Sequence, residues 1–154
     1  MRRSTKSGYI GVCGAVLTVG LLTGCSTTAV QVKGQLEVAT GQVVSAGESS
    51  TLALAQYRTG KTLNGAADTS LQDALTDIAS EQSETASMDV TTSKQRALQQ
   101  RTTRLVNRVA DEISAARAAL LEASPGRLQQ AEKRVRAATD AADSWATQLG
   151  KGAP

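Results

Sequence analysis

The chain has 154 residues, with 17 basic and 14 acidic side chains and a formal net charge of +3, and it contains no histidine and no phenylalanine. This length is enough for one small domain. With no histidine, and with Cys13 and Cys25 as its two cysteines, the chain lacks the commonest general base and most of the soft metal ligands. We therefore expect a non-enzymatic protein with no cofactor and no metal site.

The first 24 residues have the three parts of an export signal. Arg2, Arg3 and Lys6 form a basic segment without acids, and residues 8–22 form an uncharged, largely apolar run. That run is shorter than the roughly 20 residues that a helix needs to cross a hydrocarbon core. A small-residue site follows it at Gly24, so we expect residues 1–24 to be a signal peptide that is removed.

The stretch Leu22-Thr23-Gly24-Cys25 resembles the lipobox of bacterial lipoproteins. The resemblance covers residues 1–25 and implies that the Cys25 sulfur receives a diacylglyceryl group and that cleavage falls between Gly24 and Cys25. Two acyl chains hold a protein stably on a membrane, whereas one chain gives only marginal binding. The resemblance predicts a lipid-anchored protein on the extracytoplasmic, periplasmic or cell-surface, side of a cell membrane. The alternatives are an ordinary cleaved signal and a membrane-retained helix.

Removal of the signal changes the charge balance of the chain. Three of the 17 basic residues leave with it, so the remaining basic residues equal the 14 acids in number. The precursor pI near 9.1 is therefore no argument for nucleic-acid binding. Export and the lack of aromatic side chains for base stacking also argue against nucleic acid.

Residues 25–34 are predicted to be the lipidated cysteine and a flexible tether, because residues 26–34 show no helical periodicity. A helical domain over residues 35–150 and a tail over residues 151–154 follow. Residues 35–57 are the hardest part to assign. Gly41, Gly47 and the pair Val43-Val44 disfavour a regular helix. The apolar residues that would share one helical face are Leu36, Val43, Leu54 and Tyr57.

A better helix begins near Ser49 or Ser50, either of which suits an N-cap. Residues 59–65 are predicted to form a turn, with Gly60, Asn64 and Gly65 as helix breakers. A helix over residues 66–88 follows. Its apolar stripe consists of Leu71, Ala74, Leu75 and Ile78, and a second, acidic stripe consists of Asp73, Asp77, Glu81 and Glu84.

The next helix is predicted over residues 93–123, after a capping box formed by Thr92 and Gln95. Its first half is basic, and its apolar face follows the helical period. The basic residues are Lys94, Arg96, Arg101, Arg104 and Arg108. The apolar residues are Leu98, Leu105, Val109, Ile113, Ala116 and Leu120.

The last helix begins at Ser124-Pro125, because serine suits the N-cap and proline suits the first helical position. It runs to Leu149, and Gly150 suits a C-terminal cap. Its apolar stripe repeats as a heptad. The stripe consists of Leu128, Ala131, Val135, Ala138, Ala142, Trp145 and Leu149. The whole pattern predicts an all-α fold, a small antiparallel bundle or helical hairpins of three to four helices with alanine-rich, heptad-like packing.

Charge is divided unevenly between the two halves of the mature chain. Residues 25–90 hold 3 basic and 8 acidic side chains, and residues 91–154 hold 11 and 6. A hairpin that turns near Val90 would place the acidic stripe opposite the basic one. The expected pairs are Glu84–Arg96, Glu81–Arg101, Asp77–Arg104 and Asp73–Arg108. The alternatives are two separate solvated faces, or a basic face that rests on anionic lipid or wall polymer.

These features predict a membrane-anchored interaction module that contacts a protein partner in the cell envelope. The candidate contact residues are Arg101, Arg104, Arg108 and Trp145, although Trp145 also completes the heptad stripe and fits the core. A heptad face also suits self-association through helices. The alternative functions are a carrier of lipid or another apolar ligand, and a prophage-type superinfection-exclusion lipoprotein.

Overall fold

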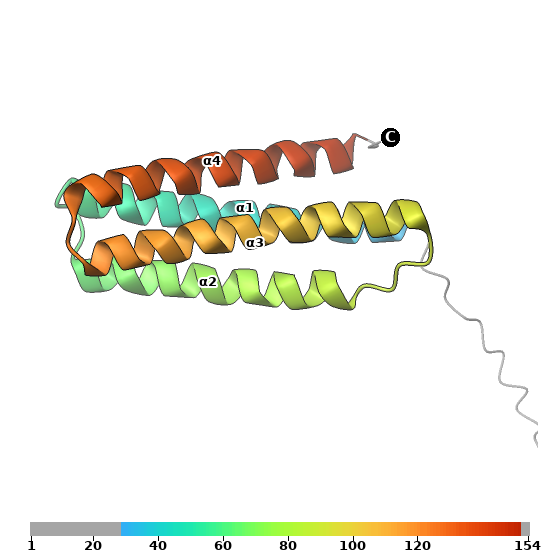
Figure 1. Cartoon of the computed structure of the whole chain (residues 1–154), viewed down its shortest axis with the longest axis horizontal. Coiled ribbons are helices and arrows are strands. Elements are labelled where there is room, and N and C mark those ends of the chain that lie inside the picture. The colour runs from blue at the N-terminus through green and yellow to red at the C-terminus, as the bar shows by residue number, and fades with distance from the viewer. Residues whose placement is uncertain (1–28, 152–154) are drawn as a thin grey trace, which may run out of the picture.

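Four helices run alternately in opposite directions along the long axis of the molecule (Figure 1). A computed structural model describes residues 29–151. The helices are α1 (Ala29–Arg58), α2 (Asn64–Ser87), α3 (Ser93–Leu121) and α4 (Pro125–Gly150). The predictions for the signal peptide, the Leu22–Cys25 lipobox and residues 152–154 lie outside the described residues.

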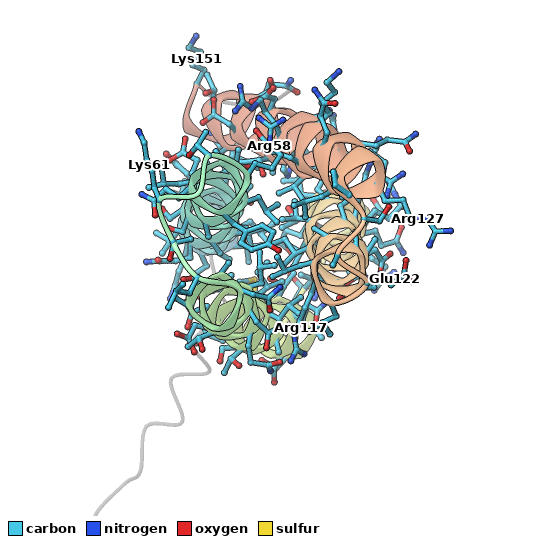
Figure 2. The ribbon with its side chains drawn as sticks, turned by 90° about the vertical axis from the view of Figure 1, so that its left-hand side faces the viewer. Arg58, Lys61, Arg117, Glu122, Arg127 and Lys151 are labelled. Carbon is cyan, nitrogen blue, oxygen red and sulfur yellow. The ribbon has the colours of Figure 1, made fainter. Side chains whose placement is uncertain are left out.

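The helices follow one another around the bundle axis. Each helix packs on its neighbours in sequence, α4 closes against α1, and α1 also contacts α3 across the diagonal. Viewed from the end with the α1–α2 and α3–α4 loops, α1 and α2 lie on one side and α3 and α4 on the other (Figure 2). We call this the two-loop end, and we call the opposite end, which holds Ala29 and Gly150, the terminal end. The predicted all-α bundle is confirmed.

Helix α1 is longer than the sequence predicts. It begins at Ala29, and Val32 is fully buried, so the predicted tether is wrong from residue 29 onward. The helix continues without a break through Gly41 and Gly47. Ser50 lies inside the helix and donates a hydrogen bond to the Ala46 carbonyl, so the predicted N-cap is also wrong. Packing of α1 on the other three helices outweighs the weak helix propensity of its residues.

The approach of α1 to α4 explains why Gly47 lies in the middle of a helix. A Cβ atom at this position would lie 2.1 Å from the Thr139 Oγ1 of α4. No residue with a side chain fits there unless Thr139 moves. The buried residues around this contact are small, among them Ala46, Ser50 and Ala138. The glycine therefore allows the two helices to pack closely.

The loops follow the local signals in part. Gly60 has a φ of +68°, so the turn predicted there is confirmed, but Asn64 and Gly65 form the first turn of α2 and do not break it. The capping box of Thr92 and Gln95 is present. It satisfies backbone N–H groups that a helix N-terminus leaves without partners.

The boundary between α3 and α4 also differs slightly from the prediction. Helix α3 ends at Leu121, and Ala123 has a φ of +50°. Pro125 is the first residue of α4 as predicted, while the Ser124 side chain makes no capping hydrogen bond. Gly150 is still helical, and Lys151 is the C-cap.

The predicted apolar stripes form the core. All seven residues of the α4 stripe are buried, as are Leu71, Ala74 and Ile78 of α2. Leu75, Leu98 and Leu105 are half-buried at the edge of the core. Most of the core side chains are alanine, valine and leucine, so the helices must lie close together to exclude water.

We predict opposite effects for alanine at two glycines of α1. Gly47→Ala forces a clash with Thr139 and should lower the free energy of unfolding by about 1–3 kcal/mol. Gly41 has no atom within 4 Å of its Cβ position, so Gly41→Ala should raise it by about 0.5–1 kcal/mol. Urea unfolding followed by circular dichroism measures both. Thr139→Ala should partly offset the loss in Gly47→Ala, and equal effects of the two glycine changes would contradict the close contact.

Candidate interaction surfaces

Trp145 belongs to the core. Its side chain is 2% exposed and packs with Val32, Leu36 and Leu149 near the terminal end. The indole N–H donates a hydrogen bond of 2.8 Å to the Thr102 Oγ1 of α3. The core interpretation of Trp145 therefore holds, and its alternative role as a contact anchor is wrong because a partner cannot reach it.

The predicted contact arginines form an exposed surface of α3. The Arg101 guanidinium lies 3.9 Å from the centre of the Trp145 ring, which places it at the α4 side of α3. Arg104 and Arg108 are exposed and make no ion pair within residues 29–151. We define the basic face as Lys94, Arg101, Arg104 and Arg108.

The direction of the basic face follows from helical geometry. Arg108 lies seven residues after Arg101, close to two full turns, and Glu112 one turn further pairs with Arg134 of α4 at 3.0 Å. This line of α3 therefore borders α4. Arg96, which the sequence groups with these residues, lies about 140° around the helix from Arg101. It is exposed on a different side.

The acidic stripe of α2 lies along the grooves between α1 and α2. Asp73, Asp77 and Glu81 line one groove, and Glu81 and Glu84 line the next one toward the terminal end. The α1 side of these grooves carries uncharged groups only. They include Gln35, Gln42, Ser45 and Ser49. We call the four acids the acidic face.

Crowding affects one carboxyl of the acidic face. Partial burial raises the pKa of Glu81 above its ordinary value, and the neighbouring Glu84 and Asp77 carboxylates raise it further. No cation lines the described grooves to offset this repulsion. The acidic face therefore carries an uncompensated charge in the monomer.

The four predicted ion pairs between α2 and α3 are wrong. None of them is present in the described part of the chain. Polar contacts between α2 and α3 instead include Asp68, which pairs with Arg117 at 2.6 Å, and Gln82, which donates a hydrogen bond to Asn107 at 2.9 Å. The acidic face looks toward α1 and the basic face toward α4, so they lie on opposite flanks of the hairpin.

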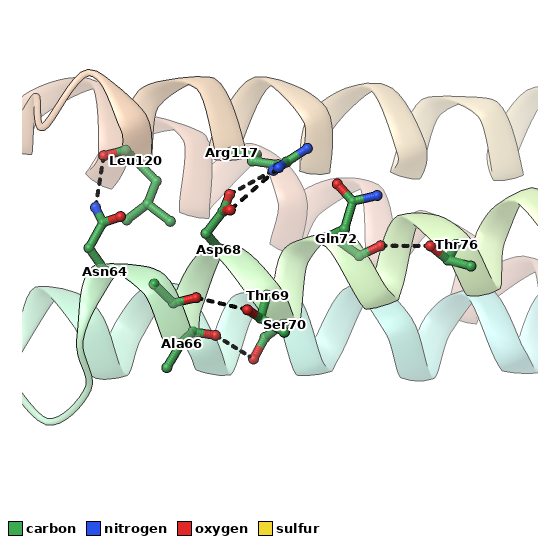
Figure 3. A network of polar contacts seen from close by, with 10 residues as sticks. Asn64, Ala66, Asp68, Thr69, Ser70, Gln72, Thr76, Arg117 and Leu120 are labelled. Atoms are coloured by element: carbon green, nitrogen blue, oxygen red, sulfur yellow. Dashed lines mark hydrogen bonds and ion pairs between the residues drawn. The ribbon is translucent and has the colours of Figure 1, made fainter.

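Ion pairs that the sequence analysis did not identify join the neighbouring helices. Arg58 of α1 lies 2.8 Å from Glu132 of α4, and the Asp68–Arg117 pair joins α2 to α3 (Figure 3). Near that pair, Asn64 donates a hydrogen bond to the Leu120 carbonyl. The hydrogen bond from Arg117 lowers the pKa of Asp68, against a smaller opposing effect of burial. Contacts of this kind set helix order and register.

Comparison with family models, with curated proteins and with solved structures gives no match. Within residues 29–151, no helix is both long and apolar enough to cross a membrane. The same residues contain no group of three or more histidine, cysteine, aspartate or glutamate side chains arranged to hold a metal ion.

We predict that the Trp145–Thr102 hydrogen bond stabilises the core. Thr102→Val leaves the buried indole N–H without an acceptor and should lower the free energy of unfolding by about 1–3 kcal/mol. Thr103→Val is the control, because Thr103 bonds only to a carbonyl of its own helix, that of Gln99. Urea unfolding should show a smaller loss for the control. Equal losses would mean that the indole bond adds nothing.

We predict that energetic coupling is present in the observed ion pair Asp68–Arg117 and absent in Asp77–Arg104, the pair expected from the sequence. Substitutions of Asp68 and Arg117 should be non-additive in a double-mutant cycle of unfolding free energies. Asp77→Lys and Arg104→Glu should be additive within about 0.3–0.5 kcal/mol, because these residues do not touch. Coupling in the second cycle and none in the first would favour the register predicted from sequence.

The Asp68–Arg117 pair also predicts that the stability of the fold depends on pH. The folded pKa of Asp68 lies below its ordinary value of 3.8, so its contribution to stability is complete above that value and is lost as the pH falls through the folded pKa. Asp68→Asn should therefore flatten part of the acid limb of the stability profile. An unchanged acid limb would show that the pair does not contribute.

Proposed function

We propose that this protein is a bacterial envelope lipoprotein, held on the extracytoplasmic face of a membrane by a diacylglyceryl group on Cys25. In this proposal the helical bundle is a non-enzymatic module that acts by contact with other envelope components. The observation that carries the proposal is the stretch Leu22-Thr23-Gly24-Cys25, which follows a basic segment and an apolar run in the order of a lipoprotein signal.

The position of α1 is consistent with this anchor. Helix α1 begins four residues after Cys25, and a chain of that length spans at most about 14 Å. The terminal end of the bundle would then lie at the bilayer surface. The bundle could not extend far from the membrane, so its partners would be membrane-bound or close to the membrane.

The bundle interior favours a contact role over the carrier alternative. A lipid carrier would need an apolar space between its helices. Here the interior is filled by buried side chains from all four helices, and the described pockets are open grooves at the surface, lined by both polar and apolar residues. The acidic and the basic face are surface features that a contact role would use.

A cysteine exchange tests the anchor. Wild-type protein should fractionate with membranes, lack residues 1–24 and carry the mass of a diacylglyceryl group. Cys25→Ser should yield unprocessed or soluble protein, because the acylated thiol is gone. Cys13→Ser is the matched control and should behave as the wild type. Intact-mass spectrometry and membrane fractionation measure both properties. Processed, membrane-bound Cys25→Ser protein would refute the proposal.

A further inference from the structure

We propose that the acidic face of one molecule binds the basic face of a second copy, so that neighbouring copies form a row along the membrane. The proposal rests on the lipid anchor for the common orientation of the copies. Each contact would join two different surfaces of the same chain. Such a heterologous contact leaves one face of each type free at the ends, and a row can therefore grow.

The acidic and the basic face cannot meet within one molecule. The acidic face lies on the α1–α2 side of the bundle and the basic face on the α3–α4 side, and these two sides face in opposite directions (Figure 2). Like charges that recur three or four residues apart on a helix repel each other. Repulsion within each face therefore destabilises the folded monomer, and the opposite charges of a second copy would offset both repulsions.

Acids of the acidic face and arginines of the basic face lie at matching heights along the bundle axis. The Asp68–Arg117 contact marks one level at which α2 and α3 lie side by side. Asp77 and Arg108 each lie nine residues from that contact toward the terminal end. Glu81 and Arg104 each lie 13 residues from it. Glu84 and Arg101 each lie 16 residues from it.

Equal residue counts along two antiparallel helices mean equal heights, because each residue adds about 1.5 Å. Two copies that stand in the same orientation and at the same height would therefore align three acids with three arginines. Lipid anchors at the same end of each copy would impose that orientation and height. Ion pairs between the acidic and the basic face, which do not form within one molecule, would then form between neighbours: Asp77 with Arg108, Glu81 with Arg104 and Glu84 with Arg101.

The groove that would receive the basic face suits cationic side chains. Its α1 side contributes glutamine and serine side chains and the exposed apolar Val38, and no cation competes there for the acids. Exposed ion pairs are individually weak, so the contact would be weak in solution. Confinement to one membrane raises the effective concentration of the copies and makes such a contact significant.

Disulfide crosslinking in intact membranes tests the proposal with the full-length protein. Ser87 lines the groove of the acidic face. Ala97 is exposed and lies four residues before Arg101, close to one turn, on the line of the basic face. They lie 19 and 20 residues from the Asp68–Arg117 level, at nearly one height. Chains with Ser87→Cys and chains with Ala97→Cys, differently tagged, are expressed together and oxidised.

A disulfide heterodimer of the two variants is expected, with little product from either variant alone. The matched control is Thr147→Cys, an exposed position on the α4 line of Arg136 and Asp140, near the same end. With Ser87→Cys it should give only the background seen without added cysteines. A heterodimer yield no greater than this background would overturn the proposal, as would binding of the basic face to anionic lipid in its place.

Charge reversal makes the test specific. Glu81→Lys in the Ser87→Cys chain, or Arg104→Glu in the Ala97→Cys chain, should each reduce the heterodimer, and both together should restore it. Lack of restoration would refute the pairing of the two faces. Intact-mass analysis of Cys25 tests the anchor separately. If the heterodimer forms while Cys25 is unmodified, the lipid anchor is excluded and the contact between the faces stands. If Cys25 is lipidated and no heterodimer forms, the anchor stands and the contact is excluded.

Discussion

The close approach of α1 to α4 at Gly47 and Thr139 is the constraint on which the rest of the bundle depends. A core made largely of alanine and valine buries little surface per residue, so it excludes water only if the helix axes come close together. Gly47 provides that closeness, since a Cβ atom at this position would overlap Thr139. Once α1 lies against α4, it also covers one flank of α2. The acidic face of α2 then borders the uncharged side of α1 and is kept away from α3.

That arrangement divides the charged residues into two groups with different roles. Asp68–Arg117, Glu112–Arg134 and Arg58–Glu132 each join two neighbouring helices and so favour one helix order. Their individual contribution to stability is small because they are partly exposed. The acidic and basic faces take no part in these pairs. Residues of these two faces form no ion pair within residues 29–151, and among them the Arg101 guanidinium lies over the Trp145 ring of the core.

Much of the fold follows from local signals, and the exceptions have physical causes. The stripe from Leu128 to Leu149, the Thr92–Gln95 capping box and Pro125 define α3 and α4 because each acts within one or two turns. The full length of helix α1 could not be predicted from local signals, because its glycines and β-branched residues disfavour a helix until other helices pack on it. Lipidation of Cys25 is predicted from the lipobox motif, and this residue lies outside the described residues. The predicted ion pairs between α2 and α3 are absent because a hairpin determines only which residues lie at the same height. The side of the hairpin on which those residues lie depends on where α1 and α4 pack. The register was also displaced by about one helical turn, which only contacts such as Asp68–Arg117 reveal.

The opposite placement of the two faces has a consequence for where association would occur. Attraction between exposed charges is screened over about 8 Å at physiological salt, so only copies that nearly touch would sense the opposite face. Freely diffusing molecules meet in all orientations, and few of those align Glu81 with Arg104. Copies that share one membrane and stand on the same end lose most of those alternatives. The two oppositely charged faces would then act as a partner-selective contact, even though residues 25–154 carry equal numbers of basic and acidic residues.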